Sequence, residues 1–190
     1  LKLARGVKDF FNFIAGYKPG SSNEAAFLRR FTYLETIAAV PGMIGGMVRH
    51  INALALMRQD MGWIHHLLQQ AENERQHLFT FLQIKKPGLP FRLVLFSAQA
   101  IHYLWYLSFY LIFPRTAHRF VGYMREESIK VYTDCIKQLD EGKLKEWKKM
   151  NASDTSIEYW GLKEDATFRD VLACIRADEA MHREIHHHFA

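Results

Sequence analysis

Residues 73–78 read Asn-Glu-Arg-Gln-His-Leu, and residues 176–182 read Arg-Ala-Asp-Glu-Ala-Met-His. Each stretch contains a Glu followed three positions later by a His, namely Glu74 with His77 and Glu179 with His182. Residues three apart on a helix share a face, so each pair can direct a carboxylate and an imidazole toward one point. The two stretches therefore predict a metal site shared by two helices.

This spacing needs support from its context, because the chain has ten His residues and a third pair, Glu184 with His187, matches by chance. That third pair points away from the helix face that carries the pair before it. Glu35 is independent support, since it lies in the otherwise apolar run 31–40, where a lone carboxylate is costly unless it is paired or bound to a metal. In ferritin-like bundles, two Glu-x-x-His helices and one Glu from each of two further helices build a di-iron site. The alternative is that the pairs lie on the surface and that Glu35 forms a salt bridge.

Proline and glycine gather in a few clusters that divide the chain into long helical patterns, and no stretch alternates convincingly with period two. We therefore expect an all-α fold in a single domain, residues 1–190. Capping boxes at Ser21 with Glu24, and at Thr167 with Asp170, mark two helix starts. The expected helices cover residues 2–15, 24–57 with a kink at Pro41-Gly42, 60–84, 89–113, 114–142 and 167–190, and the irregular segment 143–164 has room for one short helix.

The net charge of +5 suggests an anionic partner, either nucleic acid or a lipid surface. The basic residues are spread along the chain without a zinc-finger or RNA-binding signature, so we expect no nucleic acid partner. Residues 2–15 form an amphipathic basic pattern, and residues 93–113 carry no formal charge and are long enough to span a bilayer. Because polar residues interrupt the second stretch, we expect one helix face to lie on a membrane surface. A single span is the alternative.

At the residues of the predicted metal site, the chain resembles the alternative oxidases. The resemblance runs from about residue 20 to residue 190 in the family's order and spacing. The matching blocks are Tyr33-Leu34-Glu35-Thr36, Pro41-Gly42-Met43, Gly45-Gly46-Met47, Asn73-Glu74-Arg75-Gln76-His77-Leu78, His118-Arg119-Phe120-Val121-Gly122-Tyr123, Arg176-Ala177-Asp178-Glu179-Ala180 and His182.

The resemblance implies a ferritin-like four-helix bundle with two additional long helices that help to dock the protein on one leaflet. It implies two iron ions as cofactor, ubiquinol and dioxygen as substrates, and reduction of dioxygen to water without proton pumping. It also implies a homodimer on the matrix face of the mitochondrial inner membrane, or on a bacterial inner membrane if the source is not eukaryotic. Since the chain begins with Leu1 and not Met, we expect it to be the core of a longer protein, so that any targeting peptide would lie outside this sequence.

Carried over by position, the resemblance also implies roles for individual residues. The iron ligands would be Glu35, Glu74 and Glu179, with His77 and His182 as ligands or close partners. Tyr132 would be the tyrosine beside the irons, a candidate for radical or proton chemistry, with an ordinary core tyrosine as the alternative. The residues implied to line the quinol pocket are Arg30, Leu34, Met124, Glu127, Ser128 and Val131.

One block departs from the family. The family's Leu-Glu-Glu-Glu-Ala supplies a fourth carboxylate, whereas residues 124–128 here read Met-Arg-Glu-Glu-Ser and place Arg125 at that position. A cation there would be repelled by two metal ions by several kcal/mol at an effective dielectric of about 20. We favour Glu126 as a substitute metal ligand, with Arg125 swinging outward. The alternative is a damaged site that binds one iron or none, in a degenerate non-catalytic homologue.

Other membrane-bound di-iron proteins share the ligand pattern but not these flanking blocks. The runner-up enzymes are the plastid-type terminal oxidases and the demethoxyubiquinone hydroxylases. Iron storage of the ferritin kind is a further alternative, although ferritins lack a broad apolar surface of the size predicted here.

Overall fold

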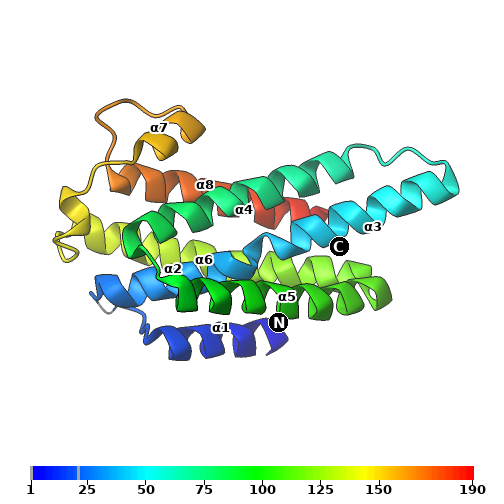
Figure 1. Cartoon of the computed structure of the whole chain (residues 1–190), viewed down its shortest axis with the longest axis horizontal. Helices are drawn as coiled ribbons and strands as arrows, with labels where there is room; N and C mark the ends of the chain where they lie inside the picture. Colours follow the sequence, from blue (N-terminus) through cyan, green and yellow to red (C-terminus); the bar gives the residue numbers. More distant parts are fainter. Residues whose placement is uncertain (1, 21) are drawn as a thin grey trace.

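The computed structural model describes residues 2–20 and 22–190, and these residues are mostly helical (Figure 1). No strand forms within these two ranges, where an isolated antiparallel bridge joins Asn151 to Thr167. The all-α prediction is confirmed. The helices are α1 (Lys2–Ala15), α2 (Glu24–Ala38), α3 (Val40–Leu56), α4 (Trp63–Lys85), α5 (Leu89–Ile112), α6 (Pro114–Asp140), the short 3₁₀ helix η1 (Trp147–Lys149), α7 (Asp154–Trp160) and α8 (Phe168–His188).

Local sequence signals explain most helix ends. The capping box of Thr167 with Asp170 is present at the start of α8, as predicted. At the start of α2, the Asn23 side chain accepts a hydrogen bond from the backbone N–H of Ala26, while the predicted capping residue Ser21 lies outside the described residues. Pro41 lacks a backbone N–H and lies in the first turn of α3. The expected kink is therefore a break between α2 and α3 at Ala39.

The long helices form a bundle with two further helices on one side. In Figure 1, α4 and α8 lie above α2 and α6, and α1 and α5 lie below them. Packing contacts join α6 to α8, α2 to α4, α1 to α2 and α5 to both α2 and α6. This arrangement agrees with a ferritin-like bundle of α2, α4, α6 and α8, with α1 and α5 as the two additional long helices.

Two apolar clusters hold the bundle together. The larger contains a run of aromatic rings, in which Phe31 of α2 stacks on Tyr132 of α6 with ring centroids 4.3 Å apart. The smaller lies among α3, α5 and α6 and includes Ile44, Tyr106 and Val121. Aromatic pairs of this geometry add about 0.5–1.5 kcal/mol beyond the apolar area that they bury, so the Phe31–Tyr132 stack helps to fix Tyr132.

One helical stretch in the described ranges, Glu24–Leu56, is long and apolar enough to cross a membrane, and most of it is buried inside the protein. The apolar composition of this stretch is explained by its burial in the core. Residues 93–113, where a single span was the alternative, lie mainly in α5 and are not this stretch. Many of their apolar side chains are instead exposed.

The close approach of α3 and α4 yields a stability prediction. A Cβ atom at Gly42 would lie 2.5 Å from the carbonyl oxygen of Leu67, whereas a Cβ at Gly6 in α1 meets nothing within 4 Å. We expect Gly42→Ala to lower the free energy of unfolding by about 1–3 kcal/mol. The control Gly6→Ala should leave it unchanged or raise it by about 0.5–1 kcal/mol. Thermal unfolding followed by circular dichroism measures both, and equal melting temperatures would contradict the close packing.

Candidate metal centre

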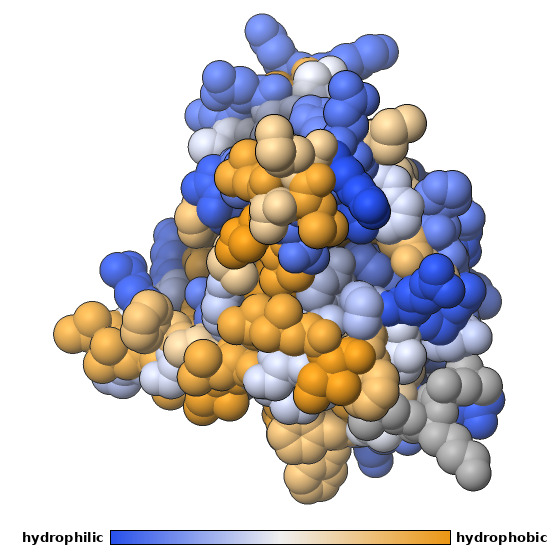
Figure 2. Space-filling view, turned by 90° about the vertical axis from the view of Figure 1, so that its right-hand side faces the viewer, coloured by the Kyte–Doolittle hydropathy of each residue, from blue (hydrophilic) through white to orange (hydrophobic). Residues whose placement is uncertain are grey.

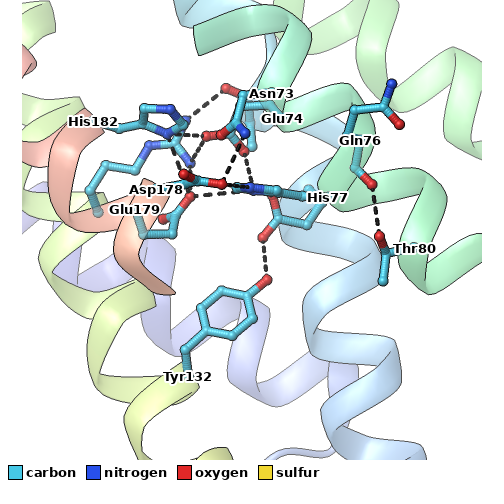
Figure 3. Close-up of polar contacts among 12 residues, drawn as sticks. Asn73, Glu74, Gln76, His77, Thr80, Tyr132, Asp178, Glu179 and His182 are labelled. Carbon is cyan, nitrogen blue, oxygen red and sulfur yellow. Dashed lines mark hydrogen bonds and ion pairs between the residues drawn. The ribbon is translucent and has the colours of Figure 1, made fainter. Parts of the chain in front are cut away.

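Four buried side chains from three helices converge at the centre of the bundle. Glu35 comes from α2, Glu74 and His77 from α4, and Glu179 from α8. One potential ligand atom from each lies within 4.8 Å of the others. Figure 3 shows Glu74, His77 and Glu179 pointing toward one another from facing helices. The structure thus brings both Glu-x-x-His helices and the isolated Glu35 to one point.

His182 and Tyr132 border this group. The Nδ1 atom of His182 lies 2.7 Å from Oε1 of Glu74, so the second Glu-x-x-His pair contributes to the same cluster. The Tyr132 hydroxyl donates a hydrogen bond of 2.7 Å to Oε1 of Glu35 (Figure 3). Burial, together with the charge of Glu35, raises the pKa of Tyr132 well above its ordinary value. Tyr132 therefore keeps its proton and presents it to Glu35.

Asp178 is a site residue to which the sequence analysis assigned no role. Its Oδ2 atom lies 3.2 Å from Nε2 of His77 and also accepts hydrogen bonds from Asn73 and Trp160. An ionised carboxylate can only accept, so Nε2 of His77 carries a proton, and Nδ1 is the ring nitrogen that faces Glu35 and Glu74. This is how a carboxylate orients a metal-binding imidazole. The only sequence signal was the presence of Asn73 and Asp178 inside the matching blocks.

Arg125 enters the same group, which differs from the expectation that it swings outward. Its Nη1 atom lies 2.7 Å from Oε1 of Glu74 and 2.7 Å from Oε1 of Glu179. Its Nη2 atom donates to the backbone carbonyl of Ala38, the last residue of α2, at 2.9 Å. The predicted outward rotation is wrong, because the buried carboxylates attract a cation more strongly than solvent does.

Glu126 does not lie in the group. Its Oε1 atom is 3.1 Å from Nε2 of His187 on the outer side of α6 and α8, and its side chain is partly exposed. One residue on a helix is about 100°, so a helix that turns Arg125 inward must turn Glu126 away. The structure therefore gives no support to Glu126 as a substitute ligand.

The buried charges shift one another's proton affinities. Burial and the neighbouring Glu74 raise the pKa of Glu35 to about 8. Burial also acts to raise the pKa of Glu74, but Arg125 and His182 hold it well below its usual value. For His77, burial lowers the pKa, yet the neighbouring carboxylates of Asp178, Glu35 and Glu74 raise it well above the ordinary value. Without a metal ion, a proton on His77 therefore offsets part of the negative charge of this group.

The donor set fits one metal ion. Buried atoms without hydrogen-bond partners include Oε2 of Glu35, Oε2 of Glu74, Oε2 of Glu179 and Nδ1 of His77. Leaving such atoms unpartnered costs free energy, and carboxylate oxygen with imidazole nitrogen is a set that suits iron and related divalent ions. The Arg125 guanidinium, however, lies 2.7 Å from both Glu74 and Glu179, two carboxylates on which a pair of ions would also depend.

An apolar cavity of about 50 Å³ lies among α1, α2, α3, α5 and α6, and Arg125 is one of the residues that line it. Three of the six predicted quinol-pocket residues, Leu34, Met124 and Ser128, line it. The other three do not: Arg30 is buried and bonded to Asn12, Glu127 contacts Lys130, and Val131 belongs to the larger apolar cluster.

Comparison with known proteins identifies the family to which the chain is similar. A family model described as alternative oxidase matches residues 1–190. The mitochondrial alternative oxidase of Trypanosoma brucei brucei is 47% identical over 189 residues, which cover 100% of this chain and 57% of that protein.

Two fungal relatives are similar to the same extent. The mitochondrial alternative oxidase of Emericella nidulans is 45% identical, covering 92% of this chain and 52% of the relative. The mitochondrial ubiquinol oxidase of Batrachochytrium dendrobatidis is 48% identical, covering 86% and 51% respectively. The chain therefore spans about half the length of the curated relatives it matches.

The Arg125 ion pairs yield a second stability prediction. Replacing Arg125 with Met removes the cation and leaves Glu74 and Glu179 buried without it, so the metal-free protein should lose about 3–5 kcal/mol of unfolding free energy. Arg115 lies on the same helix but is exposed, and Arg115→Met should change stability by less than about 0.5 kcal/mol. Denaturant unfolding in the presence of a chelator compares the two variants. Similar losses in both would argue against a buried ion pair at Arg125.

Proposed function

The chain belongs to the alternative oxidase family, and from that premise we propose that the whole protein oxidises ubiquinol and reduces dioxygen to water on a mitochondrial membrane. The observation that carries this proposal is the buried group of three carboxylates and two imidazoles, next to an apolar cavity that is lined by their ion-pair partner Arg125. We further propose the matrix face of the inner membrane, the homodimer and the absence of proton pumping, which the family resemblance implies.

The proposed quinol site is the cavity that Leu34, Met124 and Ser128 line. A second apolar hollow of about 440 Å³ lies beside it among α1, α2 and α5, and both contain Ile37. This hollow suits the apolar tail of a quinol, and we place the quinol ring in the smaller cavity. Because the ring cavity is small, binding requires side chains such as Met124 to move, which flexible methionines do readily.

Iron held by the carboxylates and imidazoles would supply the redox chemistry with dioxygen. The chain's own residues would orient the metal ligands and supply a proton. Asp178 orients His77, and the Tyr132 hydroxyl donates its proton in a hydrogen bond of 2.7 Å to Glu35. We assign no step to a second iron ion, because Arg125 contacts two of the carboxylates on which a pair of ions would depend.

The position of Arg125 also supports a second candidate, a homologue without catalytic activity. A homologue that keeps the fold but has lost turnover would tolerate a cation bonded to Glu74 and Glu179. Oxygen consumption separates the two candidates, since the non-catalytic homologue would bind quinol or metal without consuming oxygen.

We expect the purified, iron-loaded protein to consume oxygen when it is supplied with a short-chain ubiquinol. Met124→Trp should narrow the cavity and raise the KM for quinol several-fold while leaving the iron content unchanged. Met181→Trp, at an exposed position of α8, is the matched control and should behave as the parent. If the iron-loaded parent consumes no oxygen, the non-catalytic candidate is correct.

We also propose that the protein docks on one leaflet through the apolar surface of α1, α3 and α5. Figure 2 shows apolar residues gathered in the centre and lower part of one face, with hydrophilic residues above them. The exposed apolar side chains of these helices include Phe13, which is 84% exposed, Leu54, Phe96, Ile101 and Leu104. An exposed apolar area of this extent marks an interaction surface.

Charge substitutions on this surface test the docking proposal. The double variant Ile101→Asp, Leu104→Asp should lose most of its binding to vesicles that contain anionic lipid, because charges are expelled from the acyl region. Gln83→Asp, on an exposed part of α4, should bind as the parent does. Vesicle flotation measures binding, and protease mapping should find both ends of the chain on one side. Ends on opposite sides, or unaffected binding of the double variant, would refute docking on one leaflet.

A further inference from the structure

We infer that the Arg125 guanidinium takes the place of one metal ion, so that the buried group of Glu35, Glu74, His77 and Glu179 binds a single divalent cation. The inference rests on the proposed function only in assuming that a metal is bound. It concerns the number of ions and does not depend on quinol turnover.

The first support is the position of the guanidinium. Its Nη1 atom lies 2.7 Å from carboxylates of two different helices, Glu74 on α4 and Glu179 on α8. A metal ion that bridged these two carboxylates would occupy this same space. The Ala38 carbonyl holds Nη2 at 2.9 Å, and the side chain is only 4% exposed. Three contacts from three helices therefore keep Arg125 inside the group.

The second support is the balance of charge. The three carboxylates carry three negative charges and the guanidinium carries one positive charge, which leaves two negative charges when the imidazoles are neutral, as metal ligands must be. One divalent ion neutralises this remainder. A second divalent ion would leave two uncompensated positive charges in a dry site, which is strongly unfavourable.

The third support is the set of atoms that Arg125 leaves free. Glu74 and Glu179 each offer Oε1 to the guanidinium, while their Oε2 atoms have no hydrogen-bond partner. Oε2 of Glu35 and Nδ1 of His77 are also buried and unpartnered, and they lie 3.7 Å apart. Three carboxylate oxygens and one imidazole nitrogen therefore remain for a single ion. Such a set suits Fe²⁺, Mn²⁺ or another divalent ion of the first transition series.

Titration of the metal-free protein with Mn²⁺ tests the inference. The loss of the free Mn²⁺ signal in electron paramagnetic resonance gives the number of ions bound, and the spectrum of the bound ions shows whether they are coupled. We expect the parent to bind one magnetically isolated Mn²⁺ per chain. Arg125→Glu should raise the number to two, with an exchange-coupled spectrum, while Arg115→Glu should leave it at one.

Two more variants test whether Glu126 is a metal ligand and provide a substitute for an Arg125→Glu variant that does not fold. Glu126→Gln should still bind one ion, and loss of that ion would assign a ligand role to Glu126 and overturn the inference. If Arg125→Glu does not fold, as judged by circular dichroism, Arg125→Gln replaces it, and its second ion should then appear at higher Mn²⁺ concentration. Two ions or none in the parent, or one ion in a folded Arg125→Glu variant, would each overturn the inference.

Oxygen uptake by the same samples, loaded with iron, is measured separately. A parent that binds one ion and consumes no oxygen therefore refutes only the proposed oxidase.

Discussion

The structure depends on compensating three carboxylates that are buried at the centre of one helical bundle. Isolated charges cannot be buried without a partner, and each of the three has one: Arg125 for Glu74 and Glu179, and the Tyr132 hydroxyl for Glu35. Both partners, Arg125 and Tyr132, come from α6. The break at Ala39 places the end of α2, with its Ala38 carbonyl, where it can hold the guanidinium.

This constraint also connects the candidate metal centre to the apolar cavity of the proposed quinol site. Arg125 contacts the carboxylates and is also one of the residues that line the apolar cavity. A quinol ring in that cavity would therefore approach the buried group through the guanidinium. The side chain that limits the number of ions thus also lies between the metal centre and the proposed quinol site.

The features that sequence predicts well are local ones. The capping box at Thr167, the proline at the start of α3 and the i, i+3 pairing of Glu74 with His77 each depend on a few adjacent residues. The side-chain partners were not predictable in this way. Asp178 meets His77 across 101 positions of sequence. The inward turn of Arg125 results from a balance between ion pairing and solvation, which no helical pattern expresses.

The chain positions of the buried partners have a consequence for the order of folding. Arg125 is separated from Glu179 by 54 positions, and Tyr132 from Glu35 by 97. During synthesis, the N-terminal part of a chain emerges first, so Glu35 and Glu74 leave the ribosome well before α6 and α8 can supply their partners. We therefore expect these acids to stay hydrated until the last helix docks. The group would then be completed late in folding, and a metal ion bound there would be captured at that final stage.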